Sequence, residues 1–146
     1  MKKQIIVFIL FFVGLTTAFA QDWNTNFALA KEKATLENKP IILVFQGSDW
    51  CAPCIKLDRE IWSTDEFKAY SKAHFVMLKA DFPRKKQNAL SKTQAKENAT
   101  LAETYNKNGI FPFVVVLDNK GKVMGQTGYK KTTPKLFIDE LNAFLN

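Results

Sequence analysis

Cys51 and Cys54 are the only two thiols of this 146-residue chain, and two residues separate them in the segment SDWCAPCIK at residues 48–56. Two thiols at this spacing can ligate a metal ion, close a tight turn as a disulfide, or exchange electrons with other thiols and disulfides. These three functions make different demands on the rest of the sequence. The surrounding residues therefore distinguish among them.

The first 20 residues have the three parts of a cleavable secretory signal peptide. Two lysines precede an apolar stretch at residues 5–15, and Ala18 and Ala20 stand at the −3 and −1 positions of a cleavage site. The apolar stretch is shorter than the roughly 20 residues that span a bilayer. We predict a signal peptide over residues 1–20 and a mature, exported domain over residues 21–146, periplasmic or secreted, with no stable membrane anchor after cleavage. An uncleaved N-terminal anchor is the alternative.

The predicted export affects which function of the cysteine pair is favoured. Thiols outside the cytoplasm tend to be oxidised, and structural disulfides there usually join distant segments. A disulfide between Cys51 and Cys54 closes almost no loop, so it restricts the unfolded chain very little and contributes little stability. Redox chemistry explains the pair better than structural stabilisation does.

A metal site needs more ligands than the chain supplies. A structural zinc ion takes four ligands, but the sequence has two cysteines and one histidine, His74, which stands 20 residues after Cys54. We interpret His74 as structural and predict neither a metal nor a dissociable cofactor. Two thiolates can hold a soft ion such as Cu(I), so copper handling remains an alternative.

The charge balance is basic, with 21 Lys and Arg against 14 Asp and Glu and a net charge of +7. Loss of residues 1–20 removes two lysines and no acid, which leaves 19 basic residues and a net charge of +5. An exported protein does not meet nucleic acid, so we predict no nucleic-acid partner. Residues 83–100 are polar and rich in lysine, and we interpret them as a solvated insertion, with partner docking as the alternative.

Hydrophobic periodicity and turn residues divide the mature chain into alternating helices and strands. Helical patterns cover residues 22–38, 52–70 (with a kink near 63–64), 97–107 and 134 onward, and strand patterns cover 41–46, 74–82, 113–118 and 122–129. Strands joined through helices pair in parallel by right-handed crossover, and the last two strands form a hairpin. The predicted fold class is α/β, with one mixed sheet of about four strands and helices on both faces.

The cysteine motif falls where the strand at residues 41–46 gives way to the helix at residues 52–70. A sulfur at the mouth of a helix lies beside unpaired backbone N–H groups and the positive end of the helix dipole. Both favour the thiolate of Cys51, which is the species that attacks a disulfide. Cys54 is nearly one turn further along, so we expect it to be more shielded and to attack the mixed disulfide. Ile55 is expected to face inward.

Residues 50–54, Trp-Cys-Ala-Pro-Cys, follow a strand pattern, and residues 109–129, GIFPFVVVLDNKGKVMGQTGY, carry a proline at the start of a later strand and hairpin. This combination resembles the thioredoxin-fold family, and in particular exported bacterial thioredoxin-like thiol:disulfide oxidoreductases. The resemblance covers nearly all of the mature chain. It implies thiol–disulfide exchange on proteins without a cofactor, with Cys51 as the nucleophile and Cys54 as the resolving thiol.

The same resemblance implies a substrate-binding surface around the cysteines. Trp50 would form a flat wall of that surface, and Pro53 would hold the junction with the helix stiff. Pro112 is expected to follow a cis peptide bond, which would leave the backbone of Phe111 free to pair with an extended client peptide. A trans proline at the start of a strand is the alternative.

Two positions depart from the family pattern. Thioredoxins carry a buried Asp in the strand before the motif as a proton acceptor near the resolving cysteine, and Phe45 stands at that position here. The partner lysine on the next strand is replaced by Met77. Removal of a proton from Cys54 is therefore expected to use water or another carboxylate, and Asp49 and Asp58 are nearest in sequence.

These features predict a thiol–disulfide oxidoreductase that acts on protein disulfides outside the cytoplasm through the dithiol of Cys51 and Cys54. The Ala-Pro dipeptide between the cysteines resembles the Gly-Pro of reducing family members, so the expected direction is reduction or isomerisation. The predicted partners are disulfide-containing client proteins and a membrane-bound electron donor. The alternative is a redox-silent binding module that uses the fold to recognise peptides or copper ions.

Overall fold

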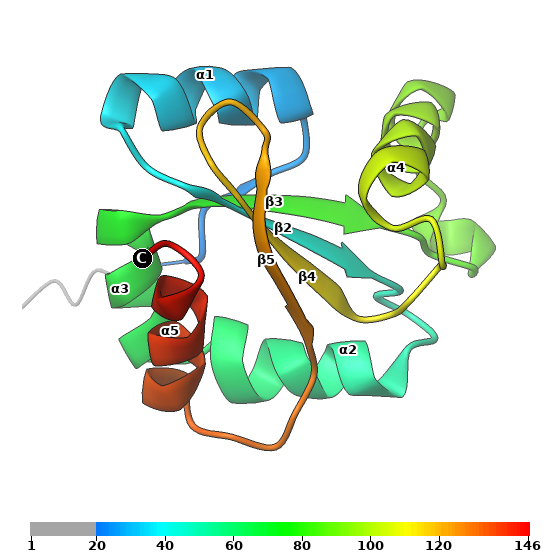
Figure 1. Cartoon of the computed structure of the whole chain (residues 1–146). Coiled ribbons are helices and arrows are strands. Elements are labelled where there is room, and N and C mark those ends of the chain that lie inside the picture. The colour runs from blue at the N-terminus through cyan, green and yellow to red at the C-terminus, as the bar shows by residue number, and fades with distance from the viewer. Residues whose placement is uncertain (1–19) are drawn as a thin grey trace, which may run out of the picture.

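A five-stranded mixed sheet forms the centre of the computed structural model, which describes residues 20–146 (Figure 1). The strands are β1 (Trp23–Asn24), β2 (Ile41–Gln46), β3 (Val76–Asp81), β4 (Phe113–Leu117) and β5 (Val123–Gly128). Their order across the sheet is β1-β3-β2-β4-β5. The first three are parallel to one another, and β4 pairs antiparallel with both β2 and β5. The predicted signal peptide falls, apart from its last residue, on residues 1–19, outside the described part.

Helices cover both faces of this sheet (Figure 1). One face carries α1 (Phe27–Glu37) and α4 (Lys92–Tyr105), and the other carries α2 (Ala52–Leu57), the π-helical turn η1 (Asp58–Trp62), α3 (Asp65–His74) and α5 (Pro134–Ala143). A short 3₁₀ turn, η2 (Lys86–Asn88), precedes α4. Within residues 20–146, every helix is too short or too polar to cross a membrane.

The first predicted helix, residues 22–38, is wrong at its start. Trp23 and Asn24 pair with Met77 and Leu78 as strand β1, which gives the sheet five strands instead of about four. Helix α1 begins later because the Asn26 side chain accepts a hydrogen bond from the backbone N–H of Leu29 at 3.0 Å and so caps the first turn. A two-residue strand is too short to produce a periodic pattern.

The second predicted helix, residues 52–70, is three consecutive elements. The predicted kink at residues 63–64 is confirmed, because the chain breaks between η1 and α3 and the Thr64 hydroxyl caps α3 by accepting from the N–H of Phe67 at 3.3 Å. Ile55 is 48% exposed, so the prediction that it faces inward is wrong. His74 lies in the last turn of α3, not at a strand start, and its ring stacks on Tyr70 at 4.2 Å.

Helix α4 begins five residues earlier than predicted. The Ser91 hydroxyl caps it by accepting from the N–H of Gln94 at 3.1 Å. The side chain of Asn98 is buried and donates to the backbone carbonyl of Asp81 at 2.8 Å. A polar residue on the inward face removes the apolar periodicity that reveals a helix, so only residues 83–91 remain as an insertion.

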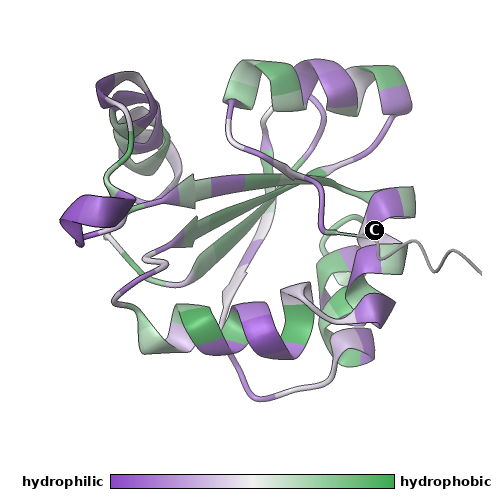
Figure 2. Ribbon diagram, turned by 180° about the vertical axis from the view of Figure 1, so that it is seen from behind, coloured by the Kyte–Doolittle hydropathy of each residue, from purple (hydrophilic) through white to green (hydrophobic). Residues whose placement is uncertain are grey.

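Alternation along the strands divides the buried side chains into two clusters. Ile42, Val44 and Met77 face α2, α3 and α5, whereas Leu43 and Phe45 face α1 and α4. Figure 2 shows the central strands in the colour of hydrophobic residues and the helices banded with both colours. This pattern is typical of a sheet covered on both faces, and every residue of β2 is buried up to Gln46, the last before the loop that leads to Cys51.

Candidate redox site

Cys51 lies where β2 has ended and α2 begins, at the N-cap of the helix. Its sulfur accepts a hydrogen bond from the backbone N–H of Cys54 at 3.3 Å, as the predicted position at a helix mouth requires. The two cysteines form a disulfide, with their Cα atoms 5.2 Å apart. Both residues are 4% exposed, so Cys54 is not the more shielded of the two as a whole residue, contrary to expectation. Pro53 is at the second helical position and is exposed.

The loop between β2 and the cysteines is fixed to the neighbouring strand. Ser48 donates twice to the carboxylate of Asp81, from its backbone N–H at 2.9 Å and from its hydroxyl at 2.6 Å. The backbone N–H of Cys51 donates to the carbonyl of Gly47 at 2.9 Å. A Cβ atom at position 47 would lie 2.2 Å from the Trp50 ring, so only glycine allows the ring to approach the backbone this closely.

Trp50 joins three loops at the site. Its indole Nε1–H donates to the carbonyl of Phe82 at 2.7 Å. Its ring meets Phe111 edge to face at a centroid distance of 5.4 Å, and the Arg84 guanidinium lies 3.7 Å from its centroid. The predicted wall of the substrate surface is therefore partly covered by an arginine from the segment after β3.

The peptide bond between Phe111 and Pro112 is cis, as predicted. The Phe111 ring lies between two aromatic neighbours, Trp50 at 5.4 Å and Phe82 at 5.5 Å. The structure thus brings Trp50, from the cysteine motif, into direct contact with Phe111, from the segment before β4.

The two departures from the family pattern lie on opposite faces of the sheet. Phe45 is fully buried beside Phe113 on the face covered by α1 and α4, whereas Met77 packs in the cluster on the other face. The carboxylates suggested as proton acceptors have other partners. Asp58 accepts from the Ser63 hydroxyl at 3.1 Å, and Asp49 binds the segment after β3.

Asp49 anchors the segment after β3, and we call its contacts with Arg84, Lys85 and Asn88 the clamp. Its carboxylate accepts from the backbone N–H groups of Arg84 at 2.9 Å and Lys85 at 3.0 Å and from the side-chain amide of Asn88 at 2.9 Å. The Arg84 amide, then the Asn88 amide, hold the pKa of Asp49 below its ordinary value. No local sequence pattern predicts this contact, because the partners are more than 30 positions apart.

The clamp has a testable pH dependence. A carboxylate whose pKa is lowered in the folded state stabilises the fold above its ordinary pKa, and this contribution is lost as the pH falls through the lower folded value. We expect the amide resonances of Arg84 and Lys85 to shift together in NMR spectra with a midpoint below 3.8, the ordinary value for Asp49. The variant Asp49→Asn should abolish this titration, and the control Asp139→Asn should retain it. A midpoint at or above 3.8 would contradict the clamp.

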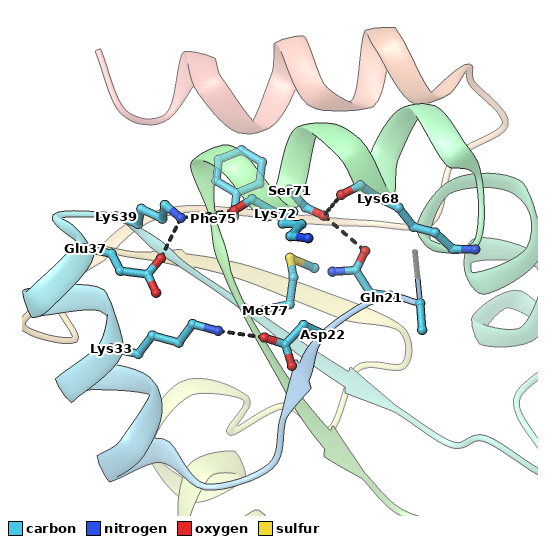
Figure 3. Close-up of a pocket in the computed structure, with 11 residues that line it drawn as sticks. Gln21, Asp22, Lys33, Glu37, Lys39, Lys68, Ser71, Lys72, Phe75 and Met77 are labelled. Carbon is cyan, nitrogen blue, oxygen red and sulfur yellow. Dashed lines mark hydrogen bonds and ion pairs between the residues drawn. The ribbon is translucent and has the colours of Figure 1, made fainter. Parts of the chain in front are cut away.

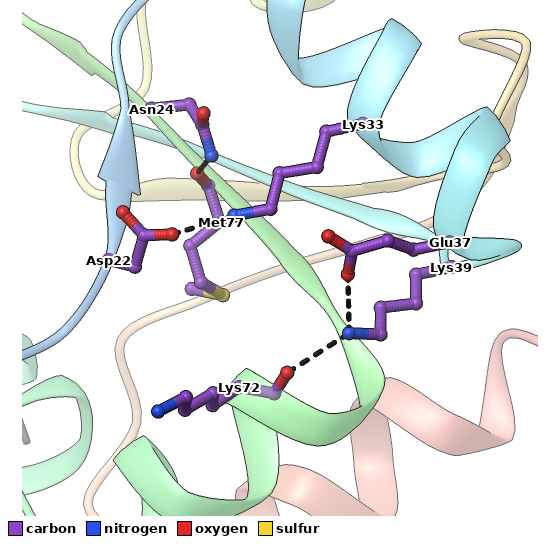
Figure 4. Close-up of polar contacts among 7 residues, drawn as sticks. All are labelled: Asp22, Asn24, Lys33, Glu37, Lys39, Lys72 and Met77. Carbon is purple, nitrogen blue, oxygen red and sulfur yellow. Dashed lines mark hydrogen bonds and ion pairs between the residues drawn. The ribbon is translucent and has the colours of Figure 1, made fainter.

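A cavity of about 480 Å³ (Figure 3) is lined in part by Lys39 and Phe75, which precede β2 and β3. It therefore lies at the end of the sheet opposite the cysteines, which follow β2. Its charged groups are largely paired: Lys33 contacts Asp22 at 2.6 Å, and Lys39 contacts Glu37 at 2.5 Å and the backbone carbonyl of Lys72 at 3.0 Å (Figure 4). No three His, Cys, Asp or Glu side chains of residues 20–146 form a cluster that could hold a metal ion. Both cysteines lie at the opposite end of the sheet, after β2, so this cavity takes no part in thiol chemistry.

The sheet, the helix-mouth disulfide and the cis proline directly before β4 define the class of thioredoxin-like proteins. The family model described as thioredoxin-like matches residues 22–119, and the chain belongs to this family. The curated disulfide bond reductase DsbH of Chlamydia pneumoniae is 33% identical over 120 residues, which cover 82% of this chain and 70% of that protein.

Solved structures agree with this assignment. A structure described as DsbH oxidoreductase superposes with a TM-score of 0.78 at 33% identity and covers 85% of this chain and 83% of its own. A disulphide isomerase from Xylella fastidiosa superposes with a TM-score of 0.60 at 23% identity, covering 82% and 88%, and this likeness concerns the fold alone. Family membership and the Cys51–Cys54 pair make the chain a thiol–disulfide oxidoreductase.

Proposed function

We propose that this protein reduces or isomerises disulfides of exported client proteins, with Cys51 as the nucleophile and Cys54 as the resolving thiol. The observation that carries the proposal is the position of the Cys51 sulfur, which accepts the Cys54 N–H at the first turn of α2. The same backbone donor would stabilise a thiolate at this sulfur once the disulfide is reduced. The name of the DsbH relative, a disulfide bond reductase, supports the reducing direction.

The reaction transfers two electrons to the client. The Cys51 thiolate attacks one sulfur of the client disulfide, forms a mixed disulfide and releases the other client sulfur as a thiolate. The Cys54 thiolate then attacks the Cys51 sulfur, releases the second client thiolate and leaves the Cys51–Cys54 disulfide. The described disulfide is the product of this half of the cycle. A further dithiol must reduce it, and we assign that task to a membrane-bound electron donor.

Client binding is assigned to the surface that surrounds the cysteines. Trp50 and Phe111 contact each other there, and Pro53 is exposed in the first turn of α2. The cis bond before Pro112 is at the start of β4, where an extended client peptide can pair with the backbone of Phe111. No cofactor takes part, because thiolate and disulfide sulfurs supply all the chemistry.

Export is supported by the basic start, short apolar stretch and Ala-Phe-Ala end of residues 1–20. An exported reductant works against an oxidising surrounding and must be recharged repeatedly. We therefore assign the protein to the periplasm or the outside of the cell, with a mature domain over residues 21–146.

Insulin reduction with dithiothreitol tests the proposed activity. We expect the wild type to accelerate the precipitation of reduced insulin, and the variant Cys51→Ala/Cys54→Ala to give the uncatalysed rate. Equilibration with glutathione buffers, read by the fraction of oxidised protein, is expected to give a potential nearer to reducing than to oxidising family members.

Equal insulin rates for the wild type and the double variant would contradict the proposal. That outcome would favour the alternative, a redox-silent module that binds peptides or copper ions. An oxidising potential would overturn the reductive direction while leaving thiol–disulfide exchange intact.

A further inference from the structure

Three consecutive basic side chains stand beside the redox site and are not used by the mechanism. Arg84, Lys85 and Lys86 are all exposed, and residues 82–91 contain no acidic residue. Within the described residues, none of these three side chains takes part in an ion pair. Figure 2 shows the η2 segment in the colour of hydrophilic residues. We call Arg84, Lys85 and Lys86 the basic wall.

The basic wall is fixed in place by contacts that leave its charges available. Asp49 binds the backbone N–H groups of Arg84 and Lys85, not their side chains. The positive charge of Lys85 also helps to lower the pKa of Asp49, but it is the smallest of the causes and ranks below the Lys85 backbone hydrogen bond. The clamp therefore holds the segment through its backbone, and no described ion pair engages the three positive side chains.

The basic wall also adjoins the residue next to the nucleophile. The Arg84 guanidinium lies 3.7 Å from the ring centroid of Trp50, which directly precedes Cys51. The Trp50 indole is in turn bound to the carbonyl of Phe82, two residues before Arg84. A peptide that presents its disulfide to Cys51 therefore approaches Arg84, and Lys85 and Lys86 follow directly in the segment that Asp49 binds.

We propose that the basic wall selects client segments that carry acidic side chains next to the reactive disulfide. This inference rests on the proposed function and adds a substrate class to it. Opposite charges attract over several ångströms at a protein surface, and like charges repel, so an acidic flank speeds encounter and a basic flank slows it. The preference should weaken as salt screens the charges.

Three peptides test the proposal, each with one cysteine joined by a disulfide to neutral 2-thiopyridine. Two residues flank the cysteine on each side, and they are Glu, Gln or Lys in otherwise identical sequences. The rate of thiopyridone release by the reduced protein is measured by stopped flow. We expect the Glu peptide to react about tenfold faster than the Lys peptide at about 20 mM NaCl, and about twofold faster at about 500 mM.

Two charge-matched variants locate the effect. The variant Lys85→Gln/Lys86→Gln should lower the Glu-to-Lys ratio at low salt to about twofold or less. The control Lys120→Gln/Lys122→Gln removes the same charge from the turn between β4 and β5, at the opposite end of the sheet, and should keep the ratio near tenfold. The ratio cancels any general change in reactivity.

The outcomes separate this inference from the proposed function. A wild-type ratio within about twofold, or a ratio that survives Lys85→Gln/Lys86→Gln, overturns selection by the basic wall while the Gln peptide still reports thiol exchange. A reduced protein that reacts with none of the three peptides overturns the proposed function, and this inference with it.

Discussion

Replacing Cys54 by serine is expected to stop turnover and to accumulate client proteins covalently joined to Cys51. Without the resolving thiol, the mixed disulfide can be released only by an external thiol, so the catalysed rate should fall by about a thousandfold. Expression of Cys54→Ser in the native host, followed by acid quenching, alkylation and non-reducing electrophoresis, should reveal adducts that dithiothreitol dissolves. Mass spectrometry of the released proteins would identify the clients.

The matched control is Cys51→Ser, which retains Cys54 as the only thiol. Cys54 lies inside α2 and lacks the N-cap position that favours the thiolate of Cys51, so this variant should form few adducts. Abundant adducts in Cys51→Ser and none in Cys54→Ser would reverse the assigned roles. No adducts in either variant would support the redox-silent binding module.

Replacing Trp62 by alanine is expected to lower the free energy of unfolding by about 3–5 kcal/mol, as for other buried tryptophans cut to alanine. Trp62 is 1% exposed, and its ring meets Trp23, Phe67 and Phe137 at centroid distances of 6.2, 4.7 and 5.3 Å. Its loss would leave a cavity between β1, α3 and α5. Urea unfolding of the oxidised protein measures the effect.

Two variants make this prediction specific. The indole N–H of Trp62 has no hydrogen-bond partner among the described residues, so Trp62→Phe removes an unpaired donor as well as part of a ring and should cost less than about half as much. Leu36 is 79% exposed, and Leu36→Ala should change the free energy by no more than about 0.5 kcal/mol. Equal effects of Trp62→Ala and Leu36→Ala would show that Trp62 does not anchor this core.

Local sequence patterns were sufficient to place the cysteines. A continuous apolar run ending at Gln46, a break at Gly47 and helical spacing from Ala52 predict a strand, a loop and a helix, and hence a helix-mouth position for Cys51. The cis bond before Pro112 came from family resemblance, because most prolines in proteins follow trans bonds.

Features that depend on long-range contacts were not predictable in this way. Strand β1 exists because Trp23 and Asn24 pair with a strand more than 50 positions later, and nothing local marks two residues as a strand. The contact between Asp49 and the Arg84 amide likewise joins residues 35 positions apart. Asn98 hides part of helix α4 from sequence analysis. Periodicity requires an apolar residue at this inward position, but the buried amide of Asn98 is satisfied by a hydrogen bond to the Asp81 carbonyl.

The two ends of the described chain lie together, at the end of the sheet where β2 starts (Figure 1). Gln21 accepts a hydrogen bond from the Ser71 hydroxyl there, and Leu145 lines a hollow with Asn38 and Pro40, just before β2. Cys51 follows the opposite end of the same strand. A bead, an electrode or a second protein domain attached through either end would therefore leave the approach to Cys51 unobstructed, which suits the molecule to immobilised catalysis.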